Sequence, residues 1–325
     1  MFMFMRPTLF AALFTVASTA LAAVPGEVIA ALDTAGYRYA VMSPDGSGLS
    51  YLSCSMVLAD LTHMSAPRYF AVWARGDNVL YEDDRGQRYF NSEIAVWDED
   101  CTQYGVLTAA GNMMMDLARW SPDGTMIAVL AAEYEFGNST PIRRGIYLAD
   151  VDYTGNRPTG VSNLRFLIES SGGFDWSPDS GRLVHNHNGD LYVFTLATGG
   201  SVNVTNTPGR GEGLPAWSST GRIAYSRLTA SGRSGDRSDI YSIPEWGGPE
   251  AQVTSKSSVS SMRNLQPAYS PDGQYLVFSS CSSLYLMKGA VGDCSLYRIR
   301  ADGSGKAAKL VGGKGQDWHL ANWRR

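Results

Sequence analysis

Short runs rich in β-branched and aromatic residues recur along the chain, each bounded by residues that favour turns. Runs of this length and composition are typical of β-strands and too short for ordinary helices. Four of them follow a tight-turn sequence: Met126–Leu130, Arg182–Val184, Arg222–Tyr225 and Tyr275–Phe278. Four later runs each contain a Leu-Tyr or Ile-Tyr pair: Gly145–Ala149, Asp190–Phe194, Asp239–Ile243 and Ser295–Ile299. The pattern predicts an all-β chain.

The turn before the first set of strands is a repeated motif, an aromatic residue followed by Ser-Pro-Asp-Gly. Proline fixes φ at the first corner, and Asp-Gly supplies a side-chain acceptor and a permissive backbone. Clear copies begin at Trp120, Trp176 and Tyr269, a degraded copy at Trp217, weaker ones at Met42 and Trp73, and a last one at Trp323. The anchors are 31 to 56 residues apart, the size of a propeller blade.

Each interval is expected to form a four-stranded antiparallel sheet that buries its faces against its neighbours. Six intervals predict a six-bladed β-propeller rather than a seven-bladed one. The first interval holds only three predicted strands, near Tyr39–Met42, Leu49–Ser53 and Met56–Leu61, while Trp318–Trp323 is a lone strand. We therefore expect the C-terminal strand to complete the N-terminal blade and close the ring.

The N-terminus carries an export signal. Arg6 precedes an apolar run, and Ala20-Leu21-Ala22 matches the small-x-small cleavage pattern. The run is shorter than the roughly 20 residues that span a bilayer, and no later segment reaches that length. We expect residues 1–22 to be a cleaved signal peptide, residues 23–36 a linker and residues 37–325 a single propeller, periplasmic or secreted, monomeric and not inserted in a membrane.

Composition adds two expectations. The formal net charge of -4 and the sequence pI near 5.6 give no electrostatic footprint for nucleic acid. The four cysteines can pair in three ways or remain reduced thiols. Cys281 ends one predicted strand and Cys294 begins the next, so an antiparallel hairpin favours their disulfide; Cys54 and Cys101 then pair by elimination.

The repeat of Trp-Ser-Pro-Asp-Gly, β-strand, Ile-Tyr, Gly turn and Val-Thr resembles the TolB-type propeller repeat over roughly residues 37 to 325. The resemblance implies the propeller and leaves the function open, because related propellers serve as binding platforms or accompany peptidase domains. TolB proteins carry an α/β domain before the propeller, and the segment before the first predicted strand here is short. The Tol–Pal role of TolB is therefore not carried over.

The sequence contains no Gly-x-Ser-x-Gly, no phosphate-binding loop and no His-Glu-x-x-His motif. This favours a non-catalytic propeller that binds a protein or cell-envelope component without a cofactor. The binding candidates lie in two long loops between predicted second and third strands. The first loop carries Glu133, Tyr134, Glu135, Phe136, Arg143 and Arg144, and the second carries Arg227, Arg233, Asp236 and Arg237.

The alternative is a metal-assisted enzyme, a polysaccharide lyase or hydrolase with its site in the central channel. Its only metal-ligand candidates are His185 and His187, which share one face if the segment is a strand and could bind a metal with Asp190. The competing interpretation is a polar strand edge. The motif residues Asp45, Asp123, Asp179 and Asp272 repeat once per blade, which indicates a turn-stabilising role rather than a catalytic one.

Overall fold

The computed structural model describes residues 27–33, 37–51, 59–60, 69–74, 81–82, 88–89, 93–98, 103–108, 112–135, 138, 140–230, 237–255, 263–282 and 293–324. Every regular element in these ranges is a β-strand, so the all-β prediction is confirmed for them. None of these residues forms an apolar helix long enough to cross a membrane. The predicted signal peptide and Cys54, Cys101, Phe136, Arg233 and Asp236 lie outside the described residues.

The four strongest motif copies each begin a four-stranded antiparallel group. The first two groups are β10 (Met113–Trp120), β11 (Met126–Tyr134), β12 (Pro141–Thr154) and β13 (Arg157–Glu169), then β14 (Phe174–Trp176), β15 (Arg182–His187), β16 (Asp190–Thr195) and β17 (Gly200–Asn203). The next two are β18 (Glu212–Trp217), β19 (Arg222–Ala230), β20 (Arg237–Pro244) and β21 (Ala251–Gln252), then β22 (Arg263–Tyr269), β23 (Tyr275–Cys281), β24 (Cys294–Arg300) and β25 (Ala308–Val311). The aromatic residue ends the first strand of each group, as predicted.

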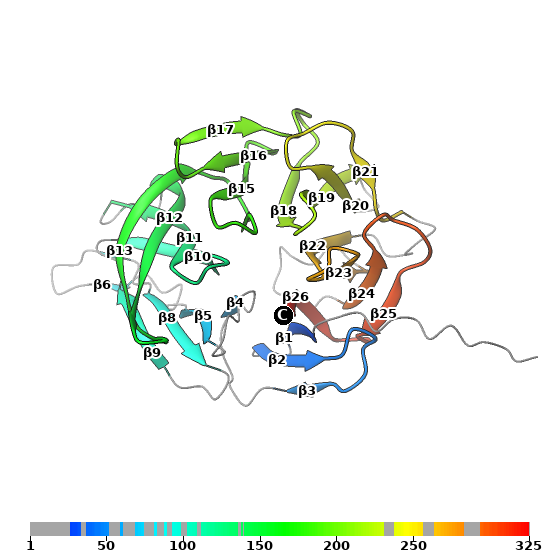
Figure 1. Cartoon of the computed structure of the whole chain (residues 1–325), viewed down its shortest axis with the longest axis horizontal. Coiled ribbons are helices and arrows are strands. Elements are labelled where there is room, and N and C mark those ends of the chain that lie inside the picture. The colour runs from blue at the N-terminus through cyan, green and yellow to red at the C-terminus, as the bar shows by residue number, and fades with distance from the viewer. Residues whose placement is uncertain are drawn as a thin grey trace, which may run out of the picture.

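Strands from both ends of the chain share another group. The C-terminal strand β26 (Asp317–Arg324) pairs antiparallel with β1 (Glu27–Asp33), which pairs with β2 (Tyr37–Met42) and then β3 (Ser50–Tyr51). The remaining strands are β4 (Ala59–Asp60), β5 (Tyr69–Ala74), β8 (Glu93–Asp98) and β9 (Gln103–Thr108), with a separate pair, β6 (Tyr81–Glu82) and β7 (Arg88–Tyr89). Figure 1 shows the groups arranged around a common centre, with β10, β18, β22 and β26 nearest to it.

The sequence did not predict β1, the strand next to β26. Glu27–Asp33 falls in the expected linker 23–36, yet it forms β1, in which Val28, Ala30 and Leu32 are buried. The alternation is hidden in the sequence because Ile29 and Ala31 between them are also apolar.

The two weaker motif copies were also misplaced. Met42 ends β2, the third strand from the centre, and Trp73 lies in β5, the second strand of its group. The strand predicted near Met56–Leu61 is β4, which pairs with β5 and not with β3. The cause is that Ser-Pro-Asp-Gly fixes a tight turn without specifying which two strands it joins.

The motif turn closes by bonds within itself. The amide of Gly124 donates to the carbonyl of Ser121 at 2.9 Å, and the Ser121 hydroxyl accepts from the amide of Met126 at 2.9 Å. The Asp123 carboxylate accepts from the Ser121 hydroxyl and from the amide of Thr125. This places β11 directly against β10, and equivalent bonds form at Ser177 and Ser270.

The core lies between neighbouring groups. Leu183 of β15 packs with Ala128 and Ile146 of the β10–β13 group, whereas Val184 packs with Trp217 and Ile223 of the β18–β21 group. Alternate residues of one strand therefore face opposite neighbours. This alternation fixes which neighbouring group each side chain of β15 faces.

Hydrogen bonds also join the groups. The indole of Trp176 donates to the carbonyl of Arg119 at 3.1 Å, and the indole of Trp323 donates to the carbonyl of Ala268 at 3.0 Å. Each acceptor precedes the motif aromatic of the preceding group. Trp323 of the C-terminal strand thus makes the same contact as an internal motif tryptophan.

Candidate functional site

The hairpins between second and third strands differ in length. The second strands of three groups begin at equivalent positions after the motif turn. Their first residues are Met126, Arg182 and Arg222, and the carbonyl of each accepts a hydrogen bond from the amide of the motif serine. From there β11 and β19 run for nine residues each, but β15 runs for only six. At about 3.3 Å per residue, the β11–β12 and β19–β20 hairpins extend roughly 10 Å further than the β15–β16 hairpin between them.

The first predicted binding loop is largely strand. Glu133 and Tyr134 lie in β11, Arg143 and Arg144 lie in β12, and the strands pair as Glu133 with Arg143. The sequence suggests a loop here because charged residues break the apolar alternation. Opposite charges on facing strand positions nevertheless support pairing.

The base of this hairpin holds a polar and aromatic cluster. The Arg143 guanidinium lies 4.7 Å from the Phe166 ring centre and 3.9 Å from the Glu133 carboxylate. The Tyr147 hydroxyl donates to Glu133 at 3.2 Å, and the Tyr147 ring meets Phe166 edge-on. Burial, with the Glu133 charge, raises the pKa of Tyr147 to about 12, so its hydroxyl stays protonated. These contacts hold Arg143 in place while half of its side chain remains exposed.

The outer part of the same hairpin faces solvent. Ile142 is 56% exposed, and Arg144 and Glu135 are exposed as well. The Asn112 side chain donates to the carbonyl of Glu135 at 3.1 Å, and the amide of Tyr134 donates to the carbonyl of Asn112 at 2.8 Å. The hairpin is therefore tied to the start of β10 while it presents an apolar side chain next to two arginines.

Arg237 in the second predicted loop is a strand residue with its charge already paired. Its guanidinium donates to Asp239 at 3.0 and 3.1 Å, and only 13% of the side chain is exposed. Asp239 also accepts from Thr254 and Asn264. Arg237 is therefore part of a structural network, and its assignment as a binding residue is not supported by this geometry.

Arg227, named in the same loop, is buried in β19 with 2% of its side chain exposed. It donates to Glu212 at the start of β18 and to Glu250 beside β21, and it lies over the ring of Tyr241 in β20 at 4.5 Å. Tyr225 donates to Glu250 at 2.8 Å, and hydrogen bonding to Arg227 lowers the pKa of Glu250. One guanidinium thus joins all four strands of its group.

Sequence reasoning missed Glu212, Tyr225 and Glu250 as members of this network. Tyr225 and Arg227 are two residues apart in a strand and so share a face, which was a usable signal. Glu212 lies on β18 and Glu250 just before β21, 15 and 23 residues from Arg227. Their convergence depends on the packing of the sheet.

The two candidate metal ligands, His185 and His187, lie on β15. They are two residues apart in the strand and therefore share one face, as predicted. His185 is 2% exposed and His187 is half-buried; both rings lie near Tyr192, with centroids 5.9 and 6.0 Å away. They share their face with Leu183, which packs against the β10–β13 group. Burial, and next the neighbouring His187, lower the pKa of His185 to about 4. β15 is second from the centre, so the pair does not lie on an innermost strand.

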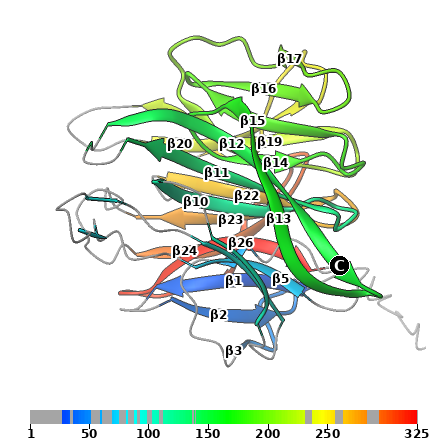
Figure 2. The ribbon, with the colours of Figure 1, turned by 90° about the vertical axis from the view of Figure 1, so that its left-hand side faces the viewer.

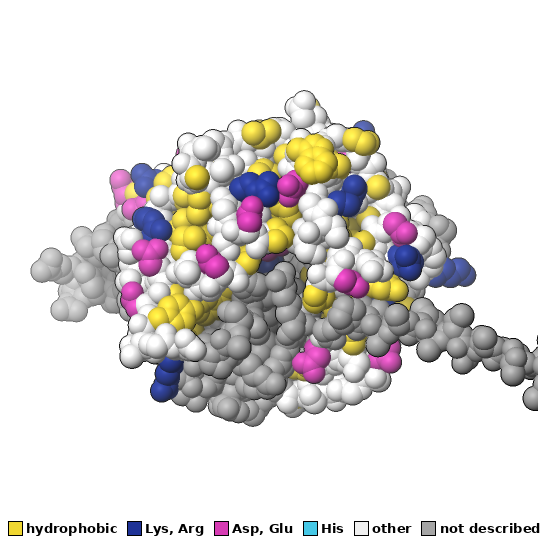
Figure 3. Space-filling view, in the orientation of Figure 1, with side chains coloured by type: hydrophobic (Ala, Val, Ile, Leu, Met, Phe, Trp, Pro, Cys, Tyr) yellow, Lys and Arg dark blue, Asp and Glu magenta, His cyan; other side chains and the backbone are white. Residues whose placement is uncertain are grey.

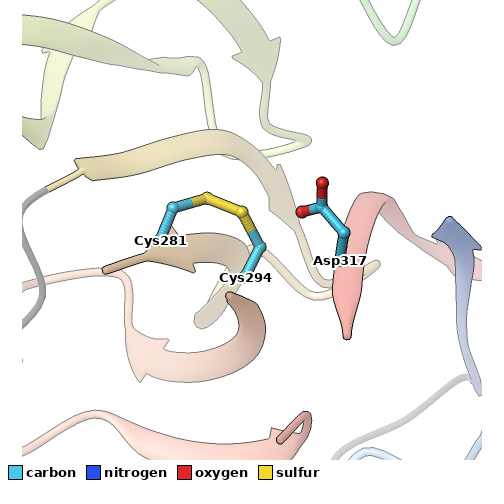
Figure 4. A group of neighbouring side chains, drawn as sticks. All are labelled: Cys281, Cys294 and Asp317. Atoms are coloured by element: carbon cyan, nitrogen blue, oxygen red, sulfur yellow. A yellow bond between two sulfur atoms is a disulfide. The ribbon is translucent and has the colours of Figure 1, made fainter. Parts of the chain in front are cut away.

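Asp190, the proposed third ligand, has other partners. Its carboxylate accepts from the Asn203 side chain and from the amide of Thr207, both at 2.9 Å. Among the described residues, one group brings together three potential ligand side chains: Cys281, Cys294 and Asp317 (Figure 4).

That group is not a thiolate metal site. Cys281 and Cys294 form a disulfide across the β23–β24 hairpin, where they are paired in register, so the predicted bond is confirmed. Neither sulfur is a free thiolate, and Asp317 is the remaining member of the group. The bond secures the hairpin next to β26, because Cys294 also pairs with Asp317.

The face opposite the β11–β12 and β19–β20 hairpins carries the motif turns. Figure 3 shows this face, with positive, negative and hydrophobic side chains interspersed among the described residues. In Figure 2 the turn from β12 to β13 extends to one side of the molecule, and the start of β12, which follows the β11–β12 turn, lies at the other. The motif aspartates accept bonds within their own turns, as at Asp179 from Ser177 and the amide of Gly181. This agrees with the turn-stabilising role expected from their repetition.

Antiparallel four-stranded groups set around a centre, packed face to face and joined through repeated motif aromatics, define a β-propeller. No protein-family model matches the chain. Comparison with solved structures shows that TolB proteins share this fold. TolB from Acinetobacter baumannii superposes with a TM-score of 0.62 at 16% identity, over 93% of this chain and 67% of that one.

Two further structures superpose over nearly their whole lengths. The putative TolB from Agrobacterium tumefaciens gives a TM-score of 0.58 at 15% identity, over 93% of this chain and 99% of that one. The periplasmic gluconolactonase PpgL from Pseudomonas aeruginosa gives 0.51 at 12% identity, over 92% and 99%. At these identities the similarity is one of fold, and the fold is shared by TolB proteins and a gluconolactonase.

Proposed function

We propose that the chain is an exported, non-catalytic, monomeric propeller that binds a protein or another cell-envelope component through the face bearing the β11–β12 and β19–β20 hairpins. The mature protein has six blades, and β26 completes the blade of β1, β2 and β3 to close the ring. The domain begins at β1. The TolB-type fold and the disulfide are compatible with a periplasmic or secreted location.

One observation carries this proposal: two hairpins extend beyond the hairpin between them and expose apolar side chains beside charged ones. Ile142 is 56% exposed next to Arg143 and Arg144, and Leu228 of β19 is 37% exposed. Interfaces are enriched in arginine and in apolar side chains that become buried on binding. Phe136, Arg233 and Asp236 remain proposed members of the same surface.

Site-specific photo-crosslinking in the native host tests this face. A photoreactive residue at Ile142 or Leu228 is expected to trap the same partner, while one at Trp246, which is 76% exposed, serves as the control away from these hairpins. The double substitution Arg143→Ala and Arg144→Ala is expected to abolish the adduct without lowering the melting temperature by more than a few degrees. If a photoreactive residue at Trp246 gives adducts and those at Ile142 and Leu228 give none, the partner does not bind the hairpin face.

The carbohydrate-active alternative required a metal site at the centre of the ring. His185 and His187 instead face the neighbouring β10–β13 group, so the described residues give it no support. Turnover of uronate polymers by the purified protein would favour this alternative over the binding function.

A further inference from the structure

The side chains of His185 and His187 form a pair on one face of β15. They are separated by one residue in the strand, so both leave the sheet toward the β10–β13 group. His185 lies deeper, and His187 lies at the end of the strand, next to the Asn188-Gly189 turn of the short β15–β16 hairpin. His187, which is half-buried, forms the solvent side of the pair, and His185 forms its buried side.

The ring nitrogens of this pair are buried without partners. Neither nitrogen of His185 has a hydrogen-bond partner among the residues that the structure describes, nor has Nδ1 of His187. Nε2 of His187 lies 3.0 Å from the Asn188 side-chain amide. Leaving a buried polar atom unpaired costs about 1–3 kcal/mol, so most such atoms in folded proteins are satisfied by protein, water or an ion.

The chemistry of the two imidazoles limits which ions the pair could bind. A neutral imidazole offers one lone pair, and two neutral imidazoles offer a pair of nitrogen donors with no negative charge. Nitrogen donors of this kind prefer borderline divalent ions such as Zn²⁺, Cu²⁺ and Ni²⁺ over Ca²⁺ or Mg²⁺, which prefer oxygen.

We propose that His185 and His187 chelate one divalent transition-metal ion in the seam between the β14–β17 and β10–β13 groups. The paired nitrogens supply two ligands, and water entering past His187 completes the coordination. The site lies beside the hairpin face but does not depend on the proposed binding function, because the geometry of β15 alone carries it.

Isothermal titration of the untagged mature protein with Zn²⁺, Cu²⁺ and Ni²⁺ separately tests the site. Wild type is expected to bind one equivalent, with Cu²⁺ tightest, as the order of divalent affinities requires. His185→Asn and His187→Asn are each expected to weaken binding by at least tenfold. The matched control is His319→Asn on β26, which removes a histidine from another group and is expected to leave the affinity unchanged.

Two further measurements keep the result decisive. Circular dichroism and urea unfolding confirm that each variant is folded, so that lost binding is not lost structure. Electron paramagnetic resonance of the Cu²⁺ form is expected to show hyperfine coupling to two nitrogens, reduced to one in either variant. Folded wild type that binds none of the three ions, or variants that bind as wild type does, would overturn the proposal.

Discussion

At the scale of single residues, the β18–β21 group depends on Arg227. Its guanidinium is buried between Glu212 and Glu250, which compensate its charge, and it stacks on the ring of Tyr241. Glu212 has a fully buried side chain. Without Arg227 its carboxylate would be left in the interior with no cation, which is far more costly than losing a surface ion pair.

Arg227→Ala is therefore expected to lower the free energy of unfolding by about 3–5 kcal/mol, measured by urea denaturation. The matched control is Arg165→Ala. Arg165 pairs with Asp150 at 2.8 Å, but both side chains are about 40% exposed, so the loss is expected to stay within about 1 kcal/mol. Similar losses in the two variants would show that the Arg227 network does not hold the group together.

The motif aspartates make stability depend on pH. A hydrogen bond from Ser177 holds the pKa of Asp179 below its ordinary value, and bonds from Ser121 and Thr125 do so for Asp123 against the opposing effect of burial. A carboxylate with a depressed pKa stabilises the folded state above the unfolded pKa of 3.8. That contribution is lost as the pH falls through the folded pKa.

The double variant Asp123→Asn and Asp179→Asn is thus expected to be less stable than wild type at pH 7, with a difference that shrinks below about pH 4. Urea denaturation at pH 7, 5, 4 and 3 measures it. Stability curves that stay parallel down to pH 3 would contradict the assigned role of these turns.

At the scale of elements, the turns between third and outer strands also join groups. Gly247, Gly303 and Gly46 all have positive φ, and each packs against the outer-strand region of the preceding group: at Val204, Val253 and Leu310. This equivalence shows why the Met42 copy lies between β2 and β3 rather than after an innermost strand. It also brings the N-terminal group against β24 and β25: Gly46 packs at Leu310 of β25, and Arg298 of β24 donates to the carbonyl of Pro44 at 2.8 Å.

Gly46→Ala tests this contact between the ends of the chain. A Cβ at Gly46 would lie 2.5 Å from the carbonyl oxygen of Leu310, whereas one at Gly155 would meet nothing within 4 Å; both residues have positive φ. Gly155→Ala is expected to cost about 1 kcal/mol from backbone strain alone, and Gly46→Ala at least about 1 kcal/mol more. Equal losses in thermal or urea unfolding would show that the turn does not rest on β25.

The sequence predicts the strands that follow the four strongest motif copies because proline, Asp-Gly and the apolar run act locally. It misplaces Met42 and Trp73, since turn chemistry does not identify the strands that a turn joins. The candidate site is less predictable. The charged segment around Glu133 and Arg143 pairs as strand, with opposite charges on facing positions. The burial of Arg227 depends on Glu212, Tyr241 and Glu250, which are distant in the sequence.

At the scale of the whole molecule, the proposed closure of the ring depends on the pairing of the two ends of the chain. β26 pairs with β1 from Glu27 opposite Arg324 to Asp33 opposite Asp317, and Val28, Trp318 and Trp323 are buried in the same cluster. In the proposed ring this pairing would join the two ends of the chain in one group and so limit free sheet edges.

The most direct test is a disulfide between these ends, made by Glu27→Cys and Arg324→Cys, whose Cα atoms are partners in the pairing. Peptide mapping without reductant is expected to find the two introduced cysteines joined to each other, and the oxidised protein to gain up to about 5 kcal/mol against unfolding, because the bond closes nearly the whole chain. Each single variant serves as control. Two results would contradict the closed ring. The new cysteines of the folded double variant could stay unpaired under oxidising conditions, or they could pair without any gain in stability.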